Sequence, residues 1–273
     1  MTQVLPTETA DSAVTTSDGR NPDGVGTVDP RPASRATRGV GTVLVTGAAS
    51  GLGRAVAAAV TAAGGRALLV DRVPVDCQEG DAGSPEGSLA AVADLADTRA
   101  AEDAIRALIE RAGGVDAVVT AAGTDRCGAL ADVPAAEWER VVAVNLFGTA
   151  AVIRAALPAL TQRRGRIVTV ASTLGLRALP DASAYCASKF GVVGMTRALA
   201  TELAGQVGVT LLVPGGMATA FFDGRPDQYK PGPDASLNDP ADVADAVVFA
   251  LTRANGCELR EMVVCQSTEP SWP

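Results

Sequence analysis

The chain has 273 residues, 47% of them hydrophobic, which is enough apolar material for one sizeable core. Its formal net charge is −8, which argues against a nucleic-acid partner or a membrane surface, because both need a clustered positive patch. Histidine is absent, which excludes Ser-His-Asp and Cys-His hydrolysis and the usual histidine-ligated metal sites within this chain, and no metal site is expected.

Residues 1–38 are rich in Thr, Ser, Asp, Pro and Gly and show no hydrophobic period, so we expect a disordered N-terminal extension. From Thr42 onward, short apolar runs alternate with long amphipathic segments, a pattern typical of βαβ units in one α/β domain over residues 39–273. Strands are predicted near residues 42–46, 66–71, 88–93, 116–120, 165–171, 208–213 and 260–265. Helices are predicted near residues 52–63, 97–112, 134–163, 184–204 and 239–253. Between Asp71 and Leu89 a crossover helix is expected to be short or missing, because breakers interrupt the period.

A glycine-bearing turn joins the first predicted strand to the first helix. Gly47 allows a tight turn, while Gly51 and Gly53 allow the backbone to approach a pyrophosphate closely. The unpaired N–H groups and the dipole of the helix N-terminus favour negative charge at this place. The turn therefore predicts a dinucleotide-binding site.

The second predicted strand ends with Asp71, about twenty residues beyond the glycine turn. A carboxylate there can accept hydrogen bonds from the adenosine ribose hydroxyls and would repel a 2′-phosphate. NAD is therefore favoured over NADP. Arg72 follows at once, so NADP stays possible.

Tyr185 and Lys189 lie four residues apart on a predicted helix and so share one face. A phenol is a poor base at neutral pH because its pKa is about 10, but a neighbouring ammonium and a nicotinamide cation favour the phenolate. This pair can perform acid–base chemistry without histidine. The same spacing, taken alone, is also typical of a surface pair.

Together these motifs resemble the single-domain branch of the short-chain dehydrogenase/reductase family. The family motif TGxxxGxG matches the segment from Thr46 to Gly53, YxxxK matches the segment from Tyr185 to Lys189, and the family serine matches Ser172. The resemblance covers about residues 41–266. It implies a doubly wound, Rossmann-type αβα sandwich of three layers with a seven-stranded parallel sheet, and NAD(P)-dependent interconversion of a secondary alcohol and a ketone.

The resemblance also implies residue roles. Tyr185 would transfer a proton to or from the substrate oxygen while a hydride moves at the nicotinamide, and Ser172 would hydrogen-bond that oxygen. Lys189 would lower the tyrosine pKa and bind the nicotinamide ribose, and Asn145 would hold a water that links Lys189 to solvent. The residues expected at the cofactor are Gly47, Ser50, Gly51, Leu52, Gly53, Asp71, Arg72, Asp94, Leu95, Ala122, Gly123, Asn145, Tyr185, Lys189, Pro214, Gly215, Met217 and Thr219.

Two stretches depart from the family pattern. Where the family has NNAG or a close variant, this chain has Thr120-Ala-Ala-Gly123, which removes asparagine side chains that steady the sheet and the adenine side. Gly123 still permits close approach of the backbone to the cofactor. The irregular segment 72–88 is the other departure, and it leaves the adenine-side wall undefined.

Residues 216–238 form a long Gly- and Pro-rich stretch at the place of the family's substrate lid, and we expect a structureless loop that closes over substrate. Residues 173–181 are a further candidate wall. The Ala- and Val-rich helices near 134–163 and 184–204 are more apolar than solvent-facing helices need to be. Because similar proteins pair these helices, a homodimer or homotetramer is expected.

The remaining features concern location and alternative functions. The five cysteines are scattered, which favours reduced thiols. The sequence shows no run of eighteen apolar residues and no signal-peptide pattern, so we expect a cytoplasmic protein. Its expected partner is a small-molecule alcohol or ketone. One alternative is a catalytically idle, NAD-sensing interaction protein. Another is a nucleotide-sugar epimerase or dehydratase, whose family branch usually has TGxxGxxG and a larger C-terminal domain, neither of which is present.

Overall fold

A computed structural model of the chain describes residues 37–75 and 88–272. The short apolar runs form strands in this part of the chain, namely β1 (Thr42–Thr46), β2 (Arg66–Asp71), β3 (Leu89–Val92), β4 (Ala117–Thr120), β5 (Arg166–Val170), β6 (Gly208–Pro214) and β7 (Glu261–Val264). They make one seven-stranded sheet in the order β3-β2-β1-β4-β5-β6-β7, and all neighbours are parallel. The predicted parallel sheet is confirmed.

The helices are α1 (Gly51–Ala62), α2 (Thr98–Ala112), α3 (Ala135–Val142), α4 (Thr149–Arg163), α5 (Ser183–Glu202) and α6 (Pro240–Leu251). A π-helical segment, η1 (Ala143–Gly148), joins α3 to α4 without a break. Three short 3₁₀ turns complete the described elements: η2 (Thr173–Gly175), η3 (Ala220–Phe222) and η4 (Asp227–Tyr229).

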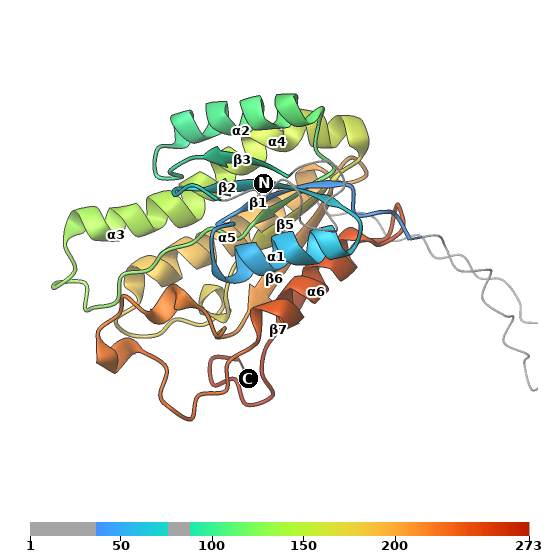
Figure 1. Cartoon of the computed structure of the whole chain (residues 1–273). Coiled ribbons are helices and arrows are strands. Elements are labelled where there is room, and N and C mark those ends of the chain that lie inside the picture. Colours follow the sequence, from blue (N-terminus) through green and yellow to red (C-terminus); the bar gives the residue numbers. More distant parts are fainter. Residues whose placement is uncertain (1–36, 76–87, 273) are drawn as a thin grey trace, which may run out of the picture. The chain divides into compact units, whose positions relative to one another are not determined.

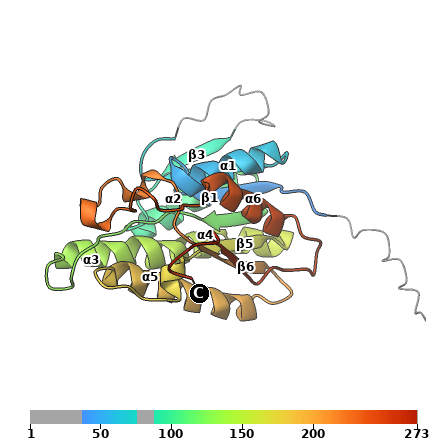
Figure 2. The ribbon, with the colours of Figure 1, turned by 90° about the horizontal axis from the view of Figure 1, so that it is seen from below.

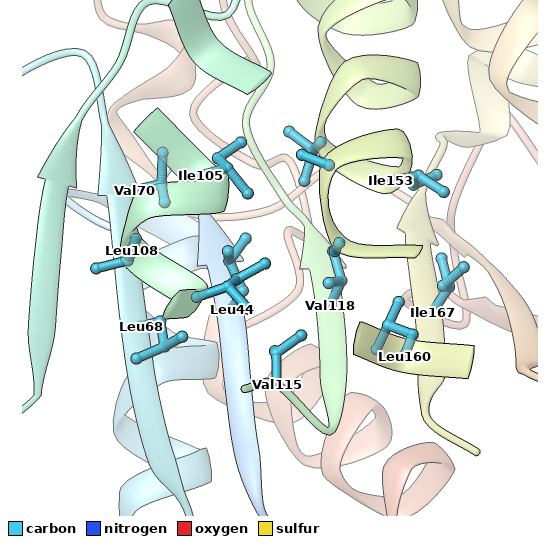
Figure 3. Packing of buried hydrophobic residues seen from close by; sticks show 14 of the residues in the cluster. Leu44, Leu68, Val70, Ile105, Leu108, Val115, Val118, Ile153, Leu160 and Ile167 are labelled. Carbon is cyan, nitrogen blue, oxygen red and sulfur yellow. The ribbon is translucent and has the colours of Figure 1, made fainter. Parts of the chain in front are cut away.

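Side-chain alternation along β1 builds a core on each face of the sheet. Leu44 belongs to a buried cluster with residues of α2 and α4, whereas its neighbours Val43 and Val45 belong to a second cluster with α1 and α6. Figures 1 and 2 show these helix pairs on opposite faces of the sheet, with α5 beside α4. Figure 3 shows Leu44 meeting Ile105 and Leu108 of α2 in the first cluster. The three-layer αβα sandwich follows from this two-sided burial.

The structure differs from two of the predictions, and two other predicted segments lie mostly outside the described residues. The predicted helix near 134–163 contains the π-helical segment η1, which hydrophobic period alone does not distinguish from an α-helix. The stretch 216–238 is not structureless, because it contains η3 and η4. The two segments that lie mostly outside are the extension predicted over residues 1–38 and the crossover segment beyond Asp71.

The most apolar 18-residue window of the continuous helical stretch Ala135–Arg163 has a mean hydropathy of 1.7, and by length and composition alone this stretch could cross a membrane. Half of its most apolar window is buried, and it packs against α2 and α5. Its apolar composition is therefore explained by its place inside the αβα sandwich. The alternating burial on its faces is typical of a helix that covers a sheet.

Candidate active site

A cavity of about 1100 Å³ opens at the carboxyl ends of the strands. Because the strands are parallel, their carboxyl ends meet at one edge, and the strand order reverses between β1 and β4. The glycine turn after β1 and the segment after β4 both line the cavity. This is the crevice in which ligands bind to doubly wound sheets.

The glycine turn fits the close approach of an anionic group. Gly47 has a φ of +71°, and a Cβ there would come within 2.8 Å of the Ala122 Cα. Gly51 has a φ of +50° and opens α1. Ser50 makes no side-chain cap, and the first turn carries no acidic residue, so the N–H groups at the start of α1 are left for a ligand.

Gly53 lines the cavity as expected, and its missing side chain has a packing reason as well. A Cβ at this position would collide with the carbonyl oxygen of Gly47, behind the turn. The missing side chain therefore lets α1 pack closely on the end of β1. Gly53 shapes the cradle, and the other two glycines provide its conformation.

The far end of the cavity carries charged side chains suited to an adenosine. Asp71 Oδ2 accepts from the N–H of Ala49 at 3.0 Å, which fixes the carboxylate beside the glycine turn. Asp94 pairs with Arg140 at 2.9 Å. The N–H of Ala96 and then Arg140 hold the pKa of Asp94 below its usual value. Arg140 was missed, because its place on α3 near Asp94 has no signal in the sequence.

The catalytic candidates gather at the opposite end, with Tyr185 and Lys189 on α5 and Ser172 capping η2. The Lys189 Nζ lies 5.6 Å from the centre of the Tyr185 ring and donates to the Val170 carbonyl at 2.9 Å. Ser172 is a hydrogen-bonding neighbour of the Tyr185 hydroxyl. The three side chains therefore meet around one phenol.

Burial dominates the electrostatics of this group. It raises the pKa of Tyr185 to about 12, and the hydrogen bond from Ser172 opposes the rise only in part. It also lowers the pKa of Lys189 to about 8. The net pKa of Tyr185 is therefore raised by burial, and the lowering that Lys189 is expected to cause does not outweigh this effect. A low dielectric disfavours both charged forms.

Asn145 lies in η1 and is 1% exposed. Its Oδ1 accepts from the N–H of Thr124 at 2.8 Å, and its Nδ2 donates to the Thr124 carbonyl and to Ser188 Oγ. The side chain thus ties the segment after β4 to α5. One lone pair of Oδ1 has no partner in the described part of the chain, and a water could donate to it.

The stretch Thr120-Ala-Ala-Gly123 has its own support in place of the family's asparagines. The Thr46 hydroxyl accepts from the N–H of Ala122 at 3.1 Å and so links β1 to the end of β4. A Cβ at Gly123 would lie 3.6 Å from Asn145 Oδ1 and 3.7 Å from Lys189 Nζ. Gly123 therefore leaves open the space where these two groups approach one another.

The lid loop, residues 216–238, covers the catalytic end with aromatic side chains. The Phe221 ring lies 5.7 Å from the Tyr185 ring and 5.6 Å from Phe222. The Tyr229 hydroxyl donates to Asp181 at 3.1 Å, which joins the lid to the predicted wall 173–181. The lid therefore rests on the loop that precedes α5.

The C-terminal segment, residues 265–272, forms a wall that sequence reasoning missed. Glu269 accepts from the N–H of Gly216 at 2.9 Å and from the hydroxyl of Ser271, and the Ser271 Oγ in turn accepts from the Thr173 hydroxyl at 2.7 Å. These bonds keep the pKa of Glu269 low although burial opposes them. The segment after β7 shows no period in the sequence, so nothing there indicated a site.

Every residue expected at the cofactor lines this one cavity except Asn145, which lies behind its wall. The positive-φ glycines, the open helix N-terminus and the fixed carboxylate of Asp71 fit a dinucleotide. In the described ranges no group of three His, Cys, Asp or Glu side chains is arranged to hold a metal ion.

Comparisons with known proteins agree with this geometry. The family model described as short chain dehydrogenase matches residues 41–230. D-threitol dehydrogenase of Mycolicibacterium smegmatis is 36% identical over 79% of this chain and 89% of its own. D-beta-hydroxybutyrate dehydrogenase of Rhizobium meliloti is 34% identical over 69% of this chain and 76% of its own. The glycine betaine reductase of Emericella nidulans is 31% identical in sequence. The match covers 83% of this chain but only 19% of that longer protein.

Solved structures give the same assignment. An alcohol dehydrogenase from Thermococcus sibiricus in complex with 5-hydroxy-NADP is 25% identical with a TM-score of 0.73, over 82% of this chain and 95% of that one. Carveol dehydrogenase from Mycobacterium avium in complex with NAD is 25% identical with a TM-score of 0.69, and the match covers 82% of this chain and 95% of that one. The chain belongs to the short-chain dehydrogenase family and is an NAD(P)-dependent oxidoreductase that acts on CH–OH groups.

Proposed function

We propose that Tyr185 is the proton-transfer group in the interconversion of a secondary alcohol and a ketone. The observation that carries this proposal is the meeting of Tyr185, Ser172 and Lys189 in the cavity that begins at the glycine turn. The cofactor, when bound, supplies the nicotinamide carbon that accepts or gives the hydride. Residues 39–273 would form the catalytic domain, with the lid loop closing over substrate.

Each side chain has a separate task in this proposal. The Tyr185 hydroxyl gives a proton to, or takes one from, the substrate oxygen, and the Ser172 hydroxyl hydrogen-bonds that oxygen and orients it. Lys189 binds the nicotinamide ribose and supplies positive charge near the phenol. Asn145 supports a water that connects Lys189 to solvent, near the open space beside Gly123.

The raised pKa of Tyr185 has a direct consequence for the direction of proton transfer. A phenol with a pKa of about 12 is protonated at neutral pH and is ready to act as an acid in ketone reduction. Alcohol oxidation needs the phenolate, which positive charge in the same cavity stabilises. Oxidation should therefore require higher pH than reduction.

Substitution of Tyr185 tests the central role. Tyr185→Phe removes the exchangeable proton and keeps the ring, so turnover should fall at least about 10³-fold while NADH binding stays within about threefold. Ser183→Ala is a matched control, because it also removes a hydroxyl from α5. The Ser183 hydroxyl accepts from Trp138, and Ser183 does not line the cavity. Retained turnover in the Tyr185 variant would refute the role.

We further propose a preference for NAD over NADP. The carboxylate of Asp71 lines the cavity beside the glycine turn and would repel a 2′-phosphate, while Arg72, also on the cavity wall, would attract one. Asp71 is the residue with the fixed position, held by two backbone N–H groups. A fluorescence titration should show tighter binding of NADH than of NADPH.

A homodimer or homotetramer in the cytoplasm completes the proposal. Phe147 and Phe190 are 57% and 46% exposed on η1 and α5, the helices expected to pair between copies. Exposed aromatic side chains of this size favour an interface. Light scattering at micromolar concentration tests it, and a monomeric mass would contradict it.

A further inference from the structure

Asp125 and Arg225 form an ion pair inside the cavity, at its catalytic end. The Arg225 Nη2 lies 2.6 Å from Asp125 Oδ2, and the two side chains are 18% and 5% exposed. Asp125 follows β4, and Arg225 belongs to the lid loop, a hundred residues away. Both residues line the cavity, but the proposed function assigns no role to this pair.

The pair lies close to the reacting phenol. The Phe221 ring lies 5.7 Å from the Tyr185 ring, and the Arg225 guanidinium lies 5.0 Å from the centre of the Phe221 ring. The charges of Asp125 and Arg225 both act on the phenol of Tyr185, in opposite senses. A substrate whose oxygen meets Tyr185 therefore occupies the end of the cavity that this pair lines.

The pair keeps hydrogen-bonding capacity of both kinds. Asp125 Oδ1 accepts only from the N–H of Arg126 within the described part of the chain. Arg225 uses one N–H for Asp125 and one for the Tyr229 carbonyl, and its Nε has no partner among the described residues. A guanidinium has five N–H groups and a carboxylate about four acceptor positions. A spare acceptor beside spare donors matches a hydroxyl group, which both donates and accepts.

The charge balance at this end disfavours an anionic substrate. The lining cations Arg126, Arg225 and Lys230 each have a carboxylate partner. Lys189, which also lines this end, is bonded to the Val170 carbonyl and is assigned to the nicotinamide ribose in the proposed function. Glu269 also lines the cavity, and in the described ranges its carboxylate is bonded to N–H and hydroxyl groups and forms no ion pair. A substrate carboxylate would have to displace Asp125 from Arg225 and approach Glu269. A neutral substrate meets neither cost.

We propose that the substrate is a neutral polyhydroxylated alcohol and that Asp125 and Arg225 together bind a second hydroxyl group of it. This inference rests on the oxidoreductase function and on the proposed role of Tyr185. A site that hydrogen-bonds a substrate hydroxyl rejects the analogue that lacks it, because the polar groups of the site are then left unpaired. Selectivity is therefore the property to measure.

The experiment compares probes in the full-length protein with its preferred dinucleotide. They are threitol, erythritol, ribitol and butane-2,3-diol, with butan-2-ol as the analogue lacking the second hydroxyl and 3-hydroxybutyrate as the anionic one. The kcat/KM of the best polyol or diol should be at least about tenfold higher than that of butan-2-ol and that of 3-hydroxybutyrate, as expected for a hydrogen bond to charged groups.

The variant Arg225→Met tests the assigned contact. It should reduce the ratio of the kcat/KM for the best polyol or diol to the kcat/KM for butan-2-ol at least about fivefold, mainly through KM. The surface variant Arg197→Met, whose ion pair with Glu261 is outside the cavity, should leave the ratio unchanged.

The ratio within one variant does not depend on how much of that variant is folded, so a destabilised Arg225→Met protein still gives an answer. Higher kcat/KM for butan-2-ol or 3-hydroxybutyrate, or an unchanged ratio in Arg225→Met, would overturn this inference and leave the proposed function intact. Absence of turnover with every polyol overturns it as well. Turnover that survives in Tyr185→Phe would instead remove the proposed function on which the inference rests.

Discussion

The buried ammonium of Lys189 makes folding depend on pH in a way that one substitution can expose. Lys189 is 4% exposed, and burial lowers its pKa from the usual 10.5 to about 8. The unfolded chain therefore holds this proton more tightly than the folded one. At pH 7 the difference amounts to a destabilisation of about 3 kcal/mol, at about 1.4 kcal/mol for each tenfold change in the proton-binding constant.

The sign over the alkaline range follows from the two pKa values. Between pH 8 and 10.5 the unfolded chain binds more protons, so the free energy of unfolding rises with pH. From pH 7 to pH 10 this group contributes an increase of about 2.5 kcal/mol. Lys189→Met has no proton to lose and should lack this increase. At pH 7 the variant should be about as stable as wild type or up to about 2 kcal/mol more stable, since the freed Val170 carbonyl offsets part of the gain.

Urea unfolding of both proteins at pH 7, 8, 9 and 10 measures this effect directly. All other titrating groups are shared, so the difference between the two proteins isolates residue 189. Arg197→Met serves as the control for loss of a cation from α5, because Arg197 is 54% exposed on its side chain and keeps its charge over this range. Parallel pH profiles for wild type and Lys189→Met would refute the assigned burial of the ammonium.

Two further substitutions test the framework of the site. Asn145→Ala leaves the Thr124 backbone groups and Ser188 without their Asn145 partner. It should lower the free energy of unfolding, measured by urea titration, by about 3 kcal/mol. Unchanged stability would contradict the hydrogen bonds of Asn145. Gly53→Ala places a methyl group against the Gly47 carbonyl, and should cost about 2 kcal/mol and weaken NADH binding in a fluorescence titration. Gly194→Ala is its control, since a Cβ at that helical position meets nothing within 4 Å, and equal effects of the two changes would count against the packing role.

The sequence was a good guide to the elements, because hydrophobic period and glycine turns are local. The boundaries of β1 and β2 agree with the predicted ones, and the other strands differ by one or two residues. The π-helical segment η1 could not be predicted, because an extra residue in one helical turn leaves the apolar pattern almost intact. Its consequence is the inward position of Asn145, which the family resemblance had supplied without a structural reason.

The charged and polar walls of the cavity were beyond local reasoning. Asp125 and Arg225 meet only because the loop after β4 and the lid loop reach the same edge of the sheet, and Glu269 arrives there after the last strand. Each of these residues sits in a stretch without period or motif. Sequence distance hides such pairs, whereas the topology of a parallel sheet brings them together.

The opposed effects of Asp125 and Arg225 on Tyr185 decide which observable can separate binding from chemistry. The Asp125 charge raises the pKa of the phenol and the Arg225 charge lowers it, so the two charges of the intact pair oppose one another. Removing the arginine leaves the carboxylate uncompensated and makes the phenolate harder to form, which slows oxidation of every alcohol alike. A loss confined to polyols cannot arise in that way, because butan-2-ol uses the same phenol. The ratio of the two substrates therefore reports the hydroxyl contact, and the loss that they share reports the electrostatic effect on Tyr185.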